Sequence, residues 1–97
     1  MAKPLSEDEI QEAIGDRLPG WSHDDDKLTR EFGFSDFREA FAFLTRIAFE
    51  AEDQVHHPEI YNVYKTVVIS LSTHDAGGKV TEKDLKLAAA IESLYTN

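Results

Sequence analysis

The sequence predicts an α+β fold, a two-layer sandwich in which three helices cover one face of a four-stranded antiparallel sheet in the order α-β-β-α-β-β-α. Two observations support this prediction. Apolar residues recur at three- and four-residue intervals in three stretches that begin with helix-capping residues, and the stretches between them alternate apolar and polar residues around turn-forming residues. A chain of 97 residues has room for one modest core, so we expect residues 1–97 to form a single domain.

The first part of the chain should form a helix and a hairpin. Ser6 and Glu9 have the spacing of a capping box, which opens a helix that we expect to run to about Asp16. Leu18-Pro19-Gly20 then breaks the helix, and Asp24-Asp25-Asp26 is typical of a hairpin tip. The return strand of this hairpin is predicted from alternate spacing of Leu28, Arg30, Phe32 and Phe34.

A long helix is expected next. Ser35 is its predicted N-cap, and Asp36 would place a favourable negative charge in the first turn. We expect the helix to end near Gln54, directly before a pair of histidines. Its predicted core-facing stripe consists of Phe37, Phe41, Leu44, Ala48 and Ala51.

A second hairpin and a third helix complete the prediction. Residues 60–64 and 65–73 should be its strands, because the second run is rich in Val, Ile and Thr, with a turn near Tyr64-Lys65. After a loop at residues 75–78, Thr81 and Asp84 resemble a capping box with Asp in place of the usual Glu. The apolar side of this last helix is predicted to contain Leu87, Ala88, Ile91, Leu94 and Tyr95.

Composition excludes several classes of function. With 19 acidic and 10 basic residues, the formal net charge of −9 would repel a phosphate backbone, so we expect no direct nucleic-acid binding. No apolar stretch approaches the roughly 20 residues of a membrane span, so no membrane association is expected. The chain has no cysteine, which excludes thiolate metal sites and is compatible with the cytoplasm.

His56, His57 and His74 are the main candidates for function. The first two stand before Pro58, which favours an extended conformation, and His74 ends the second β-rich run, so all three could meet at one rim of the sheet. Imidazole has an unperturbed pKa of about 6.5 and can exchange a proton at neutral pH. Glu52 lies one helical turn before His56 and could orient an imidazole. The pattern therefore favours an acid–base active site.

A zinc site made from His56, His57, His74 and Glu52 is a chemical alternative. Adjacent residues seldom reach one metal, however, and the chain has no His-x-His or His-x-x-x-His pair, so we expect no metal. The fourth histidine, His23, is expected to have no functional role.

The chain resembles the pterin-4a-carbinolamine dehydratase family. The resemblance rests on the acidic residue before His-His-Pro in Glu52 through Glu59, on Asn62-Val63-Tyr64, on Leu71 through Asp75 and on Thr81 through Asp84. Leu18 through Trp21 and Phe37 through Phe49 are similar to the family's N-terminal half, so that the resemblance spans nearly the whole chain.

This resemblance implies a hydro-lyase that converts 4a-hydroxytetrahydropterin to quinonoid dihydropterin and so recycles a tetrahydrobiopterin-type cofactor after aromatic amino acid hydroxylation. It implies no metal or organic cofactor, and a homodimer or homotetramer. His57 and His74 would be the proton-transfer pair, His56 would hold the pterin or act as an alternative acid, and Glu52 would orient a histidine. The residues assigned to substrate binding are Ser72, Thr73, Pro58 and Asp84.

Two departures from the family pattern, Ile60 in place of an aromatic residue and Val55 in place of an acid, leave action on a different pterin open. The alternative of another class is a non-catalytic role as a protein-binding partner or transcriptional coactivator, for instance with an aromatic amino acid hydroxylase or a regulatory protein. A binding role should survive replacement of His57 or His74 by Ala, whereas catalysis should not.

Overall fold

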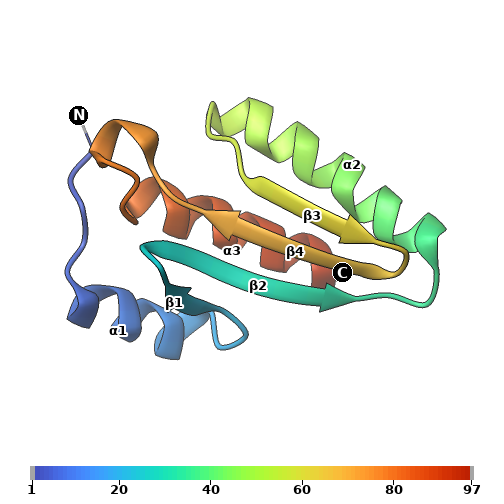
Figure 1. Cartoon of the computed structure of the whole chain (residues 1–97), viewed down its shortest axis with the longest axis horizontal. Helices are drawn as coiled ribbons and strands as arrows, with labels where there is room; N and C mark the ends of the chain where they lie inside the picture. Colours follow the sequence, from blue (N-terminus) through green and yellow to red (C-terminus); the bar gives the residue numbers. More distant parts are fainter. Residues whose placement is uncertain (1, 97) are drawn as a thin grey trace.

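The computed structural model describes residues 2–96 and shows the predicted order of elements (Figure 1). The sheet is antiparallel, with the strand order β1-β2-β4-β3, and the helices lie on one face of it. The predicted α+β two-layer fold is therefore confirmed. No helix within residues 2–96 is both long and apolar enough to cross a bilayer. The elements are α1 (Glu7–Arg17), β1 (Ser22–Asp24), β2 (Lys27–Gly33), α2 (Phe37–Gln54), β3 (Glu59–Val63), β4 (Thr66–Leu71), the 3-10 turn η1 (His74–Ala76) and α3 (Glu82–Thr96).

Both hairpins have tight two-residue turns at the predicted places. Asp25 and Asp26 join β1 to β2 with φ of 52° and 63°, the left-handed conformation that suits a hairpin of this length and that Asp tolerates. Tyr64, with φ of 51°, begins the turn between β3 and β4. The two hairpins join along β2 and β4, so these strands form the centre of the sheet.

The ends of the helices largely follow the sequence signals. In α1 the Ser6 backbone N–H donates to Glu9 Oε1 at 2.8 Å, and the Glu9 N–H donates to Ser6 Oγ at 3.1 Å, so the capping box is present. The prediction of Ser35 as the N-cap of α2 is wrong. Asp36 holds that position and accepts from the Glu39 N–H at 2.9 Å, because the chain is still extended at Asp36 and turns helical only at the next residue.

The predicted core stripe of α2 is also wrong in most of its members. Phe37 and Phe41 are 47% and 54% exposed, and Ala48 is exposed as well. The helix is apolar on two sides, and the side that faces the sheet is the one with the smaller number of phenylalanines. The α2 residues that are buried are Ala40, Phe43, Ile47 and Ala51.

The core lies between the sheet and the helices. Along β4 buried residues alternate with half-buried ones, as expected for a strand whose inner face packs against helices. Trp21 and Phe32 are almost fully buried, and the Phe32 ring contacts the rings of Trp21, Phe43 and Tyr95. Core residues from the strands and α3 include Leu28, Val67, Ile69, Leu71, Leu85, Leu87, Ala88 and Ile91.

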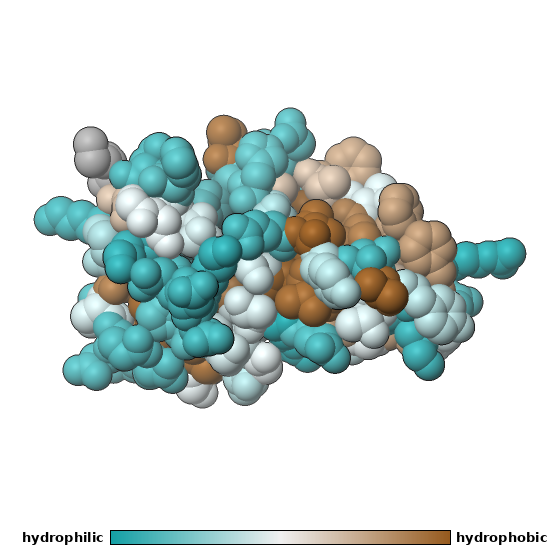
Figure 2. All heavy atoms as spheres, viewed as in Figure 1, coloured by the Kyte–Doolittle hydropathy of each residue, from teal (hydrophilic) through white to brown (hydrophobic). Residues whose placement is uncertain are grey.

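A second group of apolar side chains remains outside the core. Figure 2 shows them over α2 and the β3–β4 hairpin, on a face that is otherwise mostly hydrophilic. Ile60 also lines an apolar hollow together with Phe41, Leu44 and Ala48 of α2. We call this surface the α2–β3 patch; its exposed residues are Phe37, Phe41, Phe49, Ile60, Tyr61, Val63 and Tyr64.

Candidate active site

The three candidate histidines line one hollow of about 250 Å³. It lies where α2 ends, β4 ends and α3 begins, so it is built from segments far apart in the sequence. The expectation that the strand after Pro58 pairs with the β-rich run is confirmed by the β3–β4 ladder. The lining residues are Val55, His56, His57, Ser72, Thr73, His74, Asp75 and Lys83.

The end of α2 turns the histidine pair toward this hollow. Val55 is the C-cap of the helix, with φ of 51° and ψ of 45°, a left-handed conformation that is rare for a β-branched residue. The N–H groups of Val55 and His56 satisfy the Glu52 and Ala51 carbonyls at 3.2 and 3.0 Å. The sharp stop redirects the chain within one residue, so consecutive imidazoles leave the helix end rather than its surface.

The other wall of the hollow follows β4. This strand ends at Leu71, two residues earlier than predicted, because the Thr73 backbone pairs with Lys79 instead of continuing the ladder, with the Thr73 N–H to Lys79 carbonyl bond at 2.8 Å. His74 consequently begins the turn η1 rather than ending a strand. Gly77 and Gly78, with φ of 74° and 78°, bring the chain back toward α3 in a conformation that favours glycine.

His57 is held by Glu52 at the surface. Its Nε2 lies 2.5 Å from Glu52 Oε2, and the side chains are 63% and 76% exposed. Glu52 thus contacts the histidine five residues later, across the end of the helix, and does not itself line the hollow. The His74 side chain is exposed and makes no hydrogen bond or ion pair within residues 2–96, which leaves both of its ring nitrogens available.

His56 is held from behind by a buried carboxylate. Its Nε2 lies 2.6 Å from Asp84 Oδ1, and the two side chains are 10% and 0% exposed. The second oxygen, Asp84 Oδ2, accepts from the Thr73 hydroxyl at 2.8 Å and from the Thr81 N–H at 2.9 Å. A carboxylate buried this completely is tolerable because its oxygens are hydrogen-bonded and it faces an imidazole.

The structure therefore sorts the sequence candidates by position. Four of the five other predicted site residues line the hollow or contact a histidine that does, while Pro58 is half-buried and lies outside the lining. The sequence analysis did not anticipate Asp75 and Lys83, which line the hollow, or Thr81, which bonds to Asp84. The capping-box spacing of Thr81 and Asp84 could have indicated that the start of α3 belongs to the site.

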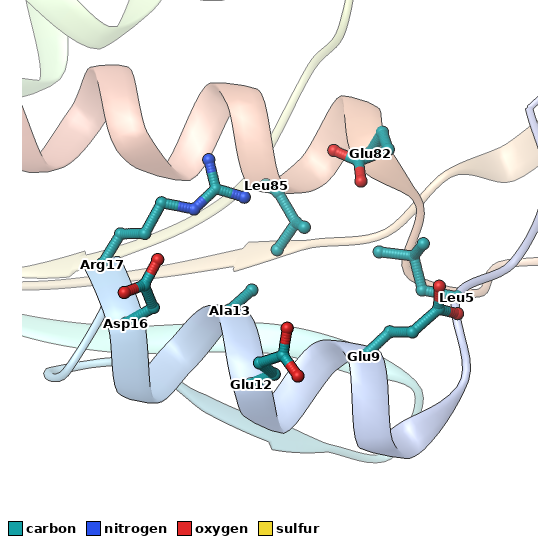
Figure 3. A pocket seen from close by; sticks show the side chains of 8 residues that line it. All are labelled: Leu5, Glu9, Glu12, Ala13, Asp16, Arg17, Glu82 and Leu85. Carbon is teal, nitrogen blue, oxygen red and sulfur yellow. The ribbon is translucent and has the colours of Figure 1, made fainter.

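A second hollow of about 200 Å³ between α1 and α3 has a different character (Figure 3). Carboxylates from both helices surround it, with the Arg17 guanidinium directed toward α3, and it contains no histidine. Within residues 2–96, no group of three or more His, Asp or Glu side chains is placed to hold a metal ion. Of these two hollows, the one lined by His56, His57 and His74 is the one that contains imidazole groups, the side chains suited to acid–base chemistry.

Comparison with known proteins identifies the family of this chain. The sequence model of the family described as Pterin 4 alpha carbinolamine dehydratase matches residues 3–94. A protein of Christiangramia forsetii, named as a candidate pterin-4-alpha-carbinolamine dehydratase, is 52% identical over 94 residues, which cover 97% of this chain and 95% of the relative. A protein of Opitutus terrae with the same name is 49% identical over 90 residues, covering 93% and 92%.

A crystal structure from Brucella melitensis, titled as a transcriptional coactivator/pterin dehydratase, superimposes with a TM-score of 0.88 at 38% sequence identity. The match covers 95% of this chain and 98% of that one. Fold, family model and near full-length relatives agree, and the chain belongs to the pterin-4a-carbinolamine dehydratase family of hydro-lyases.

Proposed function

We propose that this protein dehydrates a 4a-hydroxytetrahydropterin to the quinonoid dihydropterin in the histidine hollow, and so returns a tetrahydrobiopterin-type cofactor to use after aromatic amino acid hydroxylation. The observation that carries the proposal is the convergence of three histidines on one hollow, one of them held by the buried Asp84. A cytoplasmic location suits this role and a chain without cysteine.

The reaction needs two proton transfers. The hydroxyl oxygen on C4a must gain a proton so that the C–O bond breaks with loss of water, and a ring nitrogen must lose a proton as the new C=N bond forms. The net change is the loss of one water molecule, with no oxidation or reduction. A positioned acid or base contributes about 10² to 10⁴ in rate, so two histidines suffice for a large part of the acceleration.

We assign these transfers to His57 and His74. His74 has both ring nitrogens available, and the Glu52 carboxylate beside His57 would stabilise the positive charge that forms when this imidazole takes a proton. His56 is less exposed and is fixed by Asp84, which suits a group that holds the pterin or serves as an acid on the other face of the ring.

For substrate binding we propose Ser72, Thr73 and Pro58, with an indirect role for Asp84. Because the Thr73 hydroxyl is already bonded to Asp84 and Thr81, its contact with the pterin would come from its backbone. Asp84 is fully buried and would act through His56. Ile60 lies on β3 next to α2, outside the lining of the hollow, so replacing an aromatic residue there need not alter substrate stacking.

The direct test is the rate of 4a-hydroxytetrahydropterin dehydration, followed by absorbance, for the wild-type protein and for His57→Ala and His74→Ala. We expect a loss of about 10²-fold or more in each variant, with an unchanged circular dichroism spectrum. His23→Gln is the matched control, because His23 lies on β1, pairs with Glu7 at 2.8 Å and does not line the hollow. Wild-type protein without any acceleration would refute the proposal.

We also propose that two copies of the chain associate through the α2–β3 patch. β3 is an edge strand, and its side chains on both faces are mostly exposed and apolar. Such an edge is normally covered, and an antiparallel copy of itself is the partner that satisfies its free backbone groups. The other edge strand, β1, has three residues and an acidic turn, which suits it less. Tyr61→Lys should shift sedimentation toward the single chain; an unchanged mass would contradict this interface.

The competing hypothesis is a non-catalytic role in which the same patch binds a hydroxylase or a regulatory protein. It predicts that partner binding persists in His57→Ala and is lost in Tyr61→Lys. The two functions are therefore separable with the same set of variants.

A further inference from the structure

The contacts around Asp84 determine the direction of each hydrogen bond. The Thr81 N–H can only donate to Asp84 Oδ2, and the Thr73 hydroxyl donates to the same oxygen. The Thr73 and Thr81 hydroxyl oxygens lie 2.7 Å apart, and the Thr73 proton is already committed to Asp84. The proton between the two threonines must therefore come from Thr81. The Thr81 oxygen in turn accepts from the Lys83 N–H at 3.2 Å.

This chain of donors favours an ionised Asp84 that only accepts hydrogen bonds. Two bonds converge on Oδ2, and the remaining contact of the carboxylate is the one between Oδ1 and His56 Nε2. An ionised carboxylate requires a donor at that nitrogen, so His56 carries a proton on Nε2. Turning the ring over would place Cε1 against the carboxylate and forfeit the bond.

The other ring nitrogen of His56 then faces the hollow. Among residues 2–96, no buried side-chain nitrogen or oxygen lacks a hydrogen-bond partner, and Nδ1 of His56 has none. Nδ1 is therefore accessible, and His56 is part of the lining. In the neutral ring this atom is a lone-pair acceptor, and in the imidazolium it becomes a donor.

We infer that Thr81 is a positioning residue of the active site: through Thr73 it orients Asp84, which fixes His56 in the Nε2–H tautomer with Nδ1 presented to the substrate. The catalytic consequence rests on the function proposed above, whereas the tautomer does not. Thr81 is 1% exposed and does not line the hollow, so its effect has to pass through its neighbours.

The choice of Asp at the third position of α3 fits this double use. In an ordinary capping box a Glu reaches back to the N-cap N–H. Here Asp84 makes that bond to the Thr81 N–H and still has Oδ1 free for His56. One carboxylate thus both caps the start of α3 and supports His56. The hydrogen bond between the Thr73 and Thr81 hydroxyls also links the segment after β4 to the start of α3.

The test uses Thr81→Val, which removes the hydroxyl and nearly preserves the shape, and Thr81→Ser, which restores the hydroxyl. Ser6→Ala is the control, because it removes the N-cap of another helix, α1, at a residue that does not line the hollow, for a comparable stability loss. The tautomer of His56 is read from the ¹⁵N chemical shifts and two-bond couplings of its ring in the free protein, and kcat and KM for dehydration are measured on the same samples.

We expect the Nε2–H tautomer in wild type, Thr81→Ser and Ser6→Ala, and a measurable Nδ1–H fraction in Thr81→Val. In that variant kcat should fall by about 10-fold with KM little changed, by analogy with other residues that orient a functional histidine. Nδ1–H in the wild type, or a Thr81→Val protein that matches Ser6→Ala in both readouts, would overturn the inference. The expected tautomers in a protein that does not accelerate dehydration would uphold the orienting network and refute the proposed function.

Discussion

Phe43 and Phe41 lie two positions apart on α2, and their replacement by Ala should have very different effects. Phe43 is 2% exposed, and its ring contacts Phe32, Phe34 and Tyr95 with centroids 4.9, 5.0 and 5.7 Å away. Phe41 is 54% exposed, and its only ring contact within residues 2–96 is Phe37 at 5.5 Å. Comparing the two substitutions tests which side of α2 faces the core.

The magnitude follows from the area removed from water. A fully buried Phe covers about 150–250 Å², which at about 25 cal/mol per Å² corresponds to about 4–6 kcal/mol. Because Ala retains part of this area, Phe43→Ala should cost about 3–5 kcal/mol. Phe41 has roughly half of its surface covered, so Phe41→Ala should cost about 1–2 kcal/mol in the single chain. Against a total of about 5–15 kcal/mol for a domain of this size, the first loss is severe and the second is modest.

Urea unfolding followed by circular dichroism, repeated over a dilution series, measures both effects. The Phe43→Ala loss should be independent of protein concentration. The loss of stability in Phe41→Ala should increase with protein concentration. An associated partner stabilises the folded wild-type chain by mass action, and this substitution weakens the association. Equal losses for the two variants at the lowest concentration would refute the assignment of the core side of α2.

Three further outcomes are expected. Val55→Asn should stabilise the fold by about 0.5–1 kcal/mol in thermal unfolding, since Asn tolerates the left-handed conformation that strains Val; a lower midpoint would contradict the strain. Gly20→Ala should cost about 1–3 kcal/mol in urea unfolding, because its Cβ would come within 2.5 Å of the Arg30 guanidinium, and an unchanged stability would show that Arg30 moves freely. Glu59→Gln should lower the pKa of Lys27 in an NMR titration, because the hydrogen bond and then the charge of Glu59 raise that pKa; an unchanged pKa would show that the pair does not persist in solution.

Local signals in the sequence predicted the elements well. The Ser6 capping box, the Asp25-Asp26 turn and the stop of α2 at Gln54 each depend on a few neighbouring residues, and all three are confirmed. The N-cap at Ser35 failed because Asp36 next to it offers the same chemistry one position later. Adjacent capping residues cannot be ranked without the backbone conformation.

The failures that depend on tertiary structure are more instructive. The apolar spacing of α2 fits a stripe through Phe41 as well as one through Phe43, and only packing against the sheet decides between them. For the site, the histidines and the β3–β4 pairing were within reach of the sequence. The buried contact of Asp84 with His56 was not, because it joins residues 28 positions apart and depends on the Thr73 hydroxyl that holds Asp84 in place.

The strand order also has a consequence for how the chain folds. The β1–β2 and β3–β4 hairpins are local and can form early. The central β2–β4 ladder can form only when the two hairpins meet, which closes a loop that contains α2 and β3. The rate-limiting barrier should therefore be the docking of two preformed hairpins around α2. Substitutions in the hairpin turns, which are already formed at this barrier, would then slow folding, while those that remove contacts formed only after docking would mainly change the rate of unfolding. Because the histidine hollow is assembled from the ends of α2, β4 and α3, it comes into existence only after that barrier has been crossed.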